Sequence, residues 1–213
     1  MKKTGLFYSI FFLCLFLATT ESQGAPKDMG KKNAATTYEY ITLGGGCFWC
    51  LEAVFKEIRG VEKAESGYAG GSTVNPTYEE VCSGRTGHAE VVRITFNPEL
   101  ISLEKIIRIF FATHDPTTLN RQGADIGTQY RSVIFYRNNE QKTVIDKVIN
   151  ELKKLKAYKN PLVTEVVPYE TFYRAEDYHQ NYFQRNPDAA YCRLVINPKL
   201  EKFRKTFRDN LKK

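Results

Sequence analysis

The chain has 213 residues, of which 42% are hydrophobic and 26% charged, and its net charge is +7. After a polar N-terminal stretch about 175 residues remain, enough for one domain with a sizeable core. Five cysteines are too few for a small disulfide scaffold. The sequence has no GxGxxG loop and no P-loop, which leaves nucleotide chemistry without support.

The N-terminus has the pattern of a secretory signal over residues 1–24. Lys2 and Lys3 precede the apolar run from Leu6 to Ala18, and small and polar residues follow. The run is shorter than the roughly 20 apolar residues of a bilayer span. We therefore expect a signal peptide at 1–24, a linker at 25–37 and an extracytoplasmic domain (periplasmic or secreted) at 38–213; an uncleaved anchor is the alternative.

Residues 38–43 alternate as a strand does, and residues 51–58 have apolar side chains at helical spacing. Between them, Gly44 to Gly46 predict a tight turn that places Cys47 at the first turn of the helix. Unpaired amides and the helix dipole favour an anion there, so we expect a lowered thiol pKa and a reactive Cys47. A buried cysteine that only packs the turn is the alternative.

The remaining pattern mixes strands and helices. Residues 89–96 are the clearest strand, and Ser102 is the expected cap of the next helix. The mixture predicts an α/β fold, here a single-domain α+β two-layer sandwich with a mixed sheet and flanking helices. The other expected elements are strands at 61–68, 131–136 and 162–167, helices at 103–112 and 138–158, a loop at 113–129 that is long enough to be functional, and a short helical or irregular stretch at 176–184.

The C-terminal residues 199–213 carry seven basic and two acidic side chains. Such a tail could touch nucleic acid or an acidic membrane surface. Leu200, Phe203, Phe207 and Leu211 instead recur at helical spacing, which favours an amphipathic helix with a solvated basic face. We expect no nucleic-acid partner.

The cysteines and histidines do not form a zinc pattern. Only Cys47 and Cys50 are close in sequence, while His88, His114 and His179 stand alone. We expect no metal, and redox chemistry is the better use of the thiols.

Eight sequence blocks stand out in chain order. They are Gly-Cys-Phe-Trp at 46–49, Ser-Gly-Tyr at 66–68, Asn-Pro-Thr-Tyr-Glu-Glu-Val-Cys at 75–82, Thr-Gly-His-Ala-Glu-Val-Val at 86–92, His-Asp-Pro-Thr at 114–117, Gly-Ala-Asp-Ile-Gly-Thr-Gln-Tyr-Arg-Ser at 123–132, Ala-Glu-Asp-Tyr-His-Gln at 175–180 and Tyr-Cys at 191–192. With these blocks the sequence resembles the peptide methionine sulfoxide reductase A family over roughly residues 38–205. The resemblance implies reduction of methionine-S-sulfoxide to methionine, in oxidised proteins and as the free amino acid.

The residue chemistry agrees with this resemblance. A thiolate of Cys47 would attack the sulfoxide sulfur, and Phe48 and Trp49 would enclose the substrate methyl in an apolar pocket. Glu90 lies among apolar residues, where burial raises a carboxyl pKa toward that of a general acid. The resemblance makes Glu90 the proton donor.

Four further site residues are implied by the resemblance alone. Tyr78 and Tyr130 correspond to substrate hydrogen-bond donors, and Asp125 to an acidic residue near the site. His179 matches the histidine of its block, and we expect it to have an orienting role.

The sulfenic acid left on Cys47 would condense with a second thiol to a disulfide. We expect Cys192 to be this thiol, with Cys50 as a relay or an alternative, and we interpret Cys82 as structural. The family implies recycling by a thioredoxin-like protein or another dithiol, with no bound cofactor. We expect a monomer that acts on oxidised protein substrates.

Two rival hypotheses remain. A thiol–disulfide oxidoreductase would use Cys47-x-x-Cys50 and leave Glu90 dispensable. A secreted binding module would use the basic tail and tolerate Cys47→Ser.

Overall fold

The computed structural model describes residues 37–213. The signal peptide expected at 1–24 and nearly all of the linker expected at 25–37 lie outside these residues. Within the described part of the chain, no helix is both long and apolar enough to cross a membrane.

A six-stranded sheet with the order β7-β6-β1-β3-β2-β8 forms the centre of the domain. All neighbouring strands are antiparallel except β6 and β7, so the sheet is mixed, and the predicted fold class is confirmed. The strands are β1 (Glu39–Gly44), β2 (Val61–Ala69), β3 (Ala89–Phe96), β6 (Val133–Tyr136), β7 (Glu165–Pro168) and β8 (Phe172–Arg174), and a separate small pair consists of β4 (Arg121–Gln122) and β5 (Asp125–Ile126).

Several helices begin at side-chain caps. Ser102 accepts from the amide of Lys105, and Thr77 forms a reciprocal capping box with Glu80. The helices are α1 (Phe48–Lys56), α2 (Tyr78–Cys82), α3 (Leu103–Thr113), α4 (Asn139–Lys154), α5 (Tyr182–Arg185) and α6 (Asn197–Thr206), with short turns η1 (Thr128–Tyr130), η2 (Cys192–Ile196) and η3 (Arg208–Asn210).

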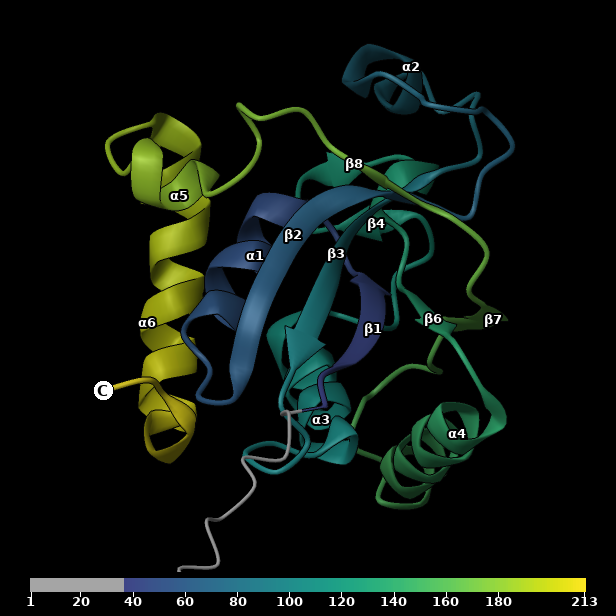
Figure 1. Cartoon of the computed structure of the whole chain (residues 1–213), viewed down its shortest axis with the longest axis vertical. Helices are drawn as coiled ribbons and strands as arrows, with labels where there is room; N and C mark the ends of the chain where they lie inside the picture. Colours follow the sequence, from purple (N-terminus) through teal and green to yellow (C-terminus); the bar gives the residue numbers. More distant parts are fainter. Residues whose placement is uncertain (1–36) are drawn as a thin grey trace, which may run out of the picture. The chain divides into compact units, whose positions relative to one another are not determined.

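The main hydrophobic core lies between the sheet and the helices, and it includes buried side chains of α1, α3, α4 and α6. A smaller cluster around Val91, Val133 and Phe135 includes residues of β3 and β6. In Figure 1, α1 and α6 lie beside each other, and α4 lies next to α3, below the β6–β7 edge of the sheet; all four helices contribute to the same core. This arrangement holds the start of α1 rigidly beside β3.

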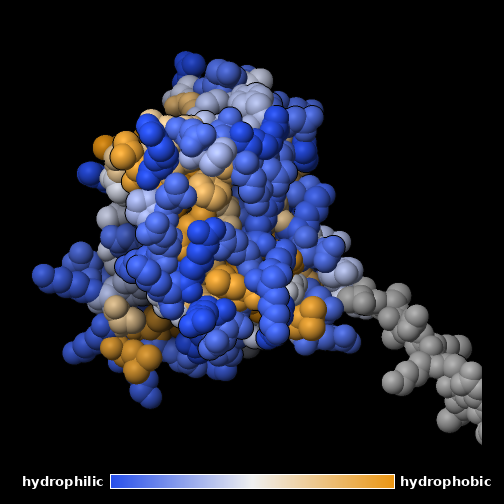
Figure 2. Space-filling view, turned by 90° about the vertical axis from the view of Figure 1, so that its left-hand side faces the viewer, coloured by the Kyte–Doolittle hydropathy of each residue, from blue (hydrophilic) through white to orange (hydrophobic). Residues whose placement is uncertain are grey.

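The structure differs from the sequence prediction in several local elements. The helix α2 and the strand β8 were not predicted, and the loop 113–129 contains β4 and β5. The C-terminal helix ends at Thr206, with Leu200 and Phe203 buried. The face that includes this helix is largely hydrophilic, with apolar side chains in separate patches (Figure 2), as expected of a solvated basic face.

Candidate active site

The glycine turn between β1 and α1 positions Cys47, as predicted. Gly46 has a φ of +91°, and its amide donates to the carbonyl oxygen of Tyr130 at 3.2 Å. A side chain is disfavoured there because an added Cβ would lie 2.6 Å from Cγ of Gln122. Cys47 is the N-cap residue of α1 and is buried.

Glu90 lies directly under the start of α1. The Phe48 amide donates to Oε2 of Glu90 at 3.0 Å, and the Glu90 side chain is buried. Burial, reinforced by the charge of Asp125, raises the pKa of Glu90 to about 8 against the opposing Phe48 hydrogen bond. At neutral pH most Glu90 side chains therefore carry a proton that they can donate.

The expectation of a lowered Cys47 pKa is wrong for the resting protein. Burial raises the pKa of Cys47, and the hydrogen bond with Cys50 and the charge of Glu90 raise it further. The hydrogen bond between the two thiols has the opposite effect on Cys50. It lowers the pKa of Cys50 to about 7 although burial opposes it, and the charge of Lys199 lowers this pKa further. Desolvation exceeds the helix-terminus effect at Cys47, so Cys50 is the more easily ionised thiol of the pair.

Phe48 and Trp49 form an aromatic wall with His179, for which the sequence predicted an orienting role. The Trp49 indole Nε1–H donates to Nδ1 of His179 at 3.1 Å, and the Phe48 and His179 ring centroids are 5.0 Å apart. The ring of Tyr182 stacks on Trp49 at 3.6 Å with an interplanar angle of 6°. Tyr182 was not singled out from the sequence, although its position three residues after His179 places it near the same ring.

Tyr78 and Tyr130 lie within reach of the charge of Glu90. Burial raises the pKa of Tyr130, and the charge of Glu90 raises it further. The pKa of Tyr78 is also raised, first by burial, then by a hydrogen bond with Cys82 and by the charge of Glu90. Both phenols therefore stay protonated and can donate hydrogen bonds. The Tyr78 ring packs against His179 at 4.5 Å.

Asp125 has a partner that the sequence reasoning missed. The Tyr191 hydroxyl donates to Oδ2 of Asp125 at 2.9 Å and lies 3.9 Å from Sγ of Cys50. Tyr191 thus connects the loop that carries Asp125 to the pair of thiols. In the sequence, the only indication of this role was the position of Tyr191 directly before Cys192.

The other two cysteines differ in burial. Cys192 begins η2 and is fully buried, and its pKa is raised by burial and then by Cys50. Cys50 is thus hydrogen-bonded to Cys47, while Cys192 lies near enough to Cys50 for the charge of Cys50 to raise its pKa. Cys82, interpreted from the sequence as structural, is exposed on α2 and is hydrogen-bonded to Tyr78.

Within residues 37–213, no group of three or more histidine, cysteine, aspartate or glutamate side chains is placed to hold a metal ion. The described site instead combines a buried thiol, a protonated carboxyl group, two phenols and an aromatic wall. Such a site can hold a small neutral group by its polar oxygen, and it can deliver a proton to that oxygen while sulfur attacks the adjacent atom.

Comparisons with known proteins agree with this chemistry. A family model described as "Peptide methionine sulfoxide reductase" matches residues 39–211. The chain is 57% identical over 171 residues to the peptide methionine sulfoxide reductase MsrA of Trichodesmium erythraeum, covering 80% of this chain and 97% of that protein. It is 55% identical over 174 residues to the MsrA of Saccharolobus solfataricus, covering 82% and 97%.

Solved structures give the same result. Methionine sulfoxide reductase A of Corynebacterium diphtheriae matches with a TM-score of 0.64 and 34% identity over 73% of this chain and 77% of that one. Mxr1 from Saccharomyces cerevisiae in its reduced form matches with a TM-score of 0.67 and 35% identity over 75% and 91%.

Proposed function

The chain belongs to the peptide methionine sulfoxide reductase family and reduces methionine sulfoxide, and from this membership and the site geometry we propose the following roles for its residues. The substrate is the S epimer of the sulfoxide, in oxidised proteins or as the free amino acid. Its methyl group packs against Phe48 and Trp49, and its oxygen accepts hydrogen bonds from Glu90, Tyr78 and Tyr130. The place of buried Glu90, which accepts a hydrogen bond from the amide next to Cys47 and whose pKa burial raises to about 8, carries the proposal.

In the first step Cys47 attacks the sulfoxide sulfur while Glu90 protonates the oxygen. The S–O bond breaks, the oxygen transfers to Cys47, and the products are methionine and a Cys47 sulfenic acid. The thiol proton of Cys47 balances the proton supplied by Glu90, so no outside reagent is consumed. The carboxylate that Glu90 becomes in this step is the base that takes up the thiol proton of Cys47, so Glu90 is protonated again when the sulfenic acid has formed.

In the second step the Cys50 thiol attacks the sulfenic sulfur, and a Cys47–Cys50 disulfide and one water are formed. Two observations support Cys50 rather than Cys192 as the first resolving thiol: it is the neighbour of Cys47, and its pKa of about 7 supplies thiolate at neutral pH. Cys192 then exchanges with Cys50, whose charge reaches it.

A thioredoxin-like protein, or another dithiol, reduces the final disulfide and restores the three thiols. The signal pattern of residues 1–24 supports an extracytoplasmic location, so this donor works outside the cytoplasm. No tightly bound cofactor takes part, because the thiols carry the electrons.

The test is reduction of separated methionine S- and R-sulfoxides with dithiothreitol by wild type, Cys47→Ser and Cys192→Ser. We expect turnover of the S epimer only, lost in Cys47→Ser and retained in Cys192→Ser. An enzyme that reduces insulin disulfides and neither sulfoxide would refute the proposal.

A further inference from the structure

The carboxylate of Glu176 contacts three residues from separate parts of the fold. Its Oε1 accepts from the Tyr78 amide at 2.9 Å, and its Oε2 accepts from the Tyr68 hydroxyl at 2.8 Å. Oε2 also lies 3.8 Å from Nε2 of His179. Tyr78 begins α2, Tyr68 lies on β2 and His179 follows β8. One side chain therefore links α2 and β2 to the segment 175–180.

Two of these residues pack against the aromatic wall, which consists of Phe48, Trp49 and His179, and the third belongs to it. The Tyr68 ring lies 5.9 Å from the Phe48 ring, and the Tyr78 ring lies 4.5 Å from that of His179, measured between ring centroids. His179 in turn accepts the hydrogen bond of the Trp49 indole. The carboxylate thus reaches both rings proposed to hold the substrate methyl through a single intervening residue.

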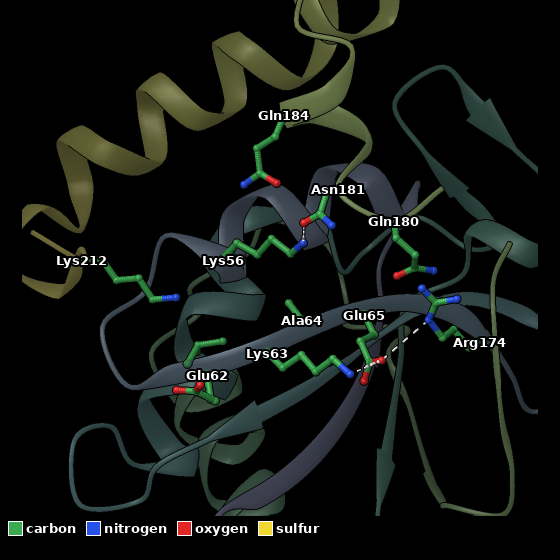
Figure 3. A pocket seen from close by; sticks show the side chains of 11 residues that line it. Lys56, Glu62, Lys63, Ala64, Glu65, Arg174, Gln180, Asn181, Gln184 and Lys212 are labelled. Carbon is green, nitrogen blue, oxygen red and sulfur yellow. Dashed lines mark hydrogen bonds and ion pairs between the residues drawn. The ribbon is translucent and has the colours of Figure 1, made fainter. Parts of the chain in front are cut away.

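The segment 175–180, which carries Glu176 and His179, is attached to β2 at both ends. The Ala175 amide donates to the Ser66 carbonyl oxygen at 3.0 Å. The side chain of Gln180 accepts from the Ser66 amide at 3.2 Å and donates to the same carbonyl oxygen at 2.9 Å, and Figure 3 shows this side chain directed toward β2. Glu176 and His179 lie between the two attachments, so the backbone that carries them is fixed against the sheet.

Glu176 is ionised at neutral pH. Burial raises its pKa, but hydrogen bonds from its own amide, from the Tyr78 amide and from the Tyr68 hydroxyl outweigh burial and hold this pKa below its usual value. Both oxygens of the group are therefore acceptors, and the group carries a negative charge.

This charge determines which way the His179 ring faces. Burial lowers the pKa of His179, although the charge of Glu176 opposes this, so the ring is neutral at neutral pH. Its Nδ1 accepts from the Trp49 indole, so the ring proton is on Nε2. Nε2 is buried and has no hydrogen-bond partner among residues 37–213, and Oε2 of Glu176 is 3.8 Å away. The carboxylate therefore attracts this N–H by its charge and keeps Nδ1 turned toward Trp49.

We propose that Glu176 is a positioning residue, which holds the aromatic wall and Tyr78 in the geometry that receives methionine sulfoxide. It acts through its three partners and not on the sulfoxide itself. This inference rests on the proposed function and adds a residue to that site. Because the wall contacts the substrate methyl both before and during the reaction, loss of the Glu176 charge should weaken binding more than it slows the chemical step.

The test variant is Glu176→Gln, which keeps the shape of the side chain and loses its charge. A carboxamide has one acceptor oxygen, so in either orientation its NH2 group faces an N–H donor, that of Tyr78 or that of His179. In single-turnover release of methionine from the reduced protein, we expect the half-saturating concentration of S-sulfoxide to rise about five- to tenfold and the limiting rate to fall less than about threefold. Asp177→Asn is the matched control, because it removes the neighbouring carboxylate, whose side chain is 89% exposed and bonds to Arg174. It should leave both values unchanged.

Trp49 provides a second measurement that does not depend on activity. It is the only tryptophan of the chain, so the protein without substrate has a single indole N–H resonance in its nuclear magnetic resonance spectrum. Glu176→Gln should move this proton resonance upfield, because the hydrogen bond from the indole to His179 weakens. Asp177→Asn should leave the resonance in place.

Tyr68→Phe tests the same contacts without a change at Glu176. It removes one of the hydrogen bonds to the carboxylate and should raise the half-saturating concentration by a smaller factor, so the test is decisive even if Glu176→Gln does not fold. Wild-type values of the half-saturating concentration and of the indole resonance in these variants would overturn the proposal. A limiting rate about a hundredfold lower with unchanged half-saturation would also overturn it, since Glu176 would then act in the chemical step. A wild type that reduces neither sulfoxide would instead mark failure of the proposed function.

Discussion

Replacing Glu90 by glutamine should make the protein more stable while it removes the proton donor. The carboxyl group is buried in the folded protein, where its pKa is about 8, compared with the usual value of 4.5 that applies to the unfolded chain. Below about pH 4.5 both folded and unfolded chains hold the proton, and the group has no effect on stability. Between these two values only the unfolded chain releases the proton, so stability falls as the pH rises.

The loss of stability caused by the raised Glu90 pKa is about 1.36 kcal/mol for each pH unit between the two pKa values. At pH 7 the penalty reaches about 3 kcal/mol, and above about pH 8 it stops growing. Glu90→Gln removes this penalty and keeps an oxygen that can accept from the Phe48 amide. Its free energy of unfolding should therefore exceed that of wild type by an amount that grows from pH 5 to pH 8, while kcat/KM falls about 10²- to 10⁴-fold.

Urea unfolding at pH 5, 7 and 8 measures this difference. Glu65→Gln is the control, because its effect on stability should change with pH in the opposite direction. Burial raises the pKa of Glu65, but the hydrogen bonds from Lys63 and Arg93 outweigh burial and hold this pKa below its usual range. That variant should lose stability at neutral pH and less so in acid, where the native carboxylate is protonated. A Glu90→Gln protein destabilised equally at pH 5 and pH 8 would refute the buried, protonated state on which the mechanism depends.

Three further predictions concern the turn, the aromatic wall and the thiols. Gly46→Ala should lower the free energy of unfolding by about 1–3 kcal/mol, measured in urea, because φ is +91° and the new Cβ would crowd Gln122; an unchanged midpoint would contradict this. Trp49→Phe removes the hydrogen bond to His179 and should raise KM several-fold more than it lowers kcat in steady-state assays. Cys50→Ser should release one equivalent of methionine but leave the Cys47 sulfenic acid trappable by dimedone, whereas rapid disulfide formation in this variant would assign the resolving role elsewhere.

Local signals in the sequence identified much of the site. Three glycines between an alternating segment and a helical one predicted the turn and the position of Cys47, because such features depend on neighbouring residues. The alternation at 89–96 likewise predicted β3 and placed Glu90 among apolar residues. Short elements such as α2 and β8 escaped prediction because their few residues carry little periodicity and form through contacts with distant segments.

The sequence alone predicted the positions of Cys47, of Glu90 on its strand and of the Phe48–Trp49 pair, since each lies in a short stretch whose pattern is local. Only the tertiary structure decided which thiol neighbours Cys47, because Cys50 and Cys192 are equally eligible by residue type. It also decided the direction of the Cys47 pKa, where burial by the whole core exceeds the local effect of the helix terminus. The bond from Trp49 to His179 joins residues 130 positions apart, and no local pattern encodes such a contact.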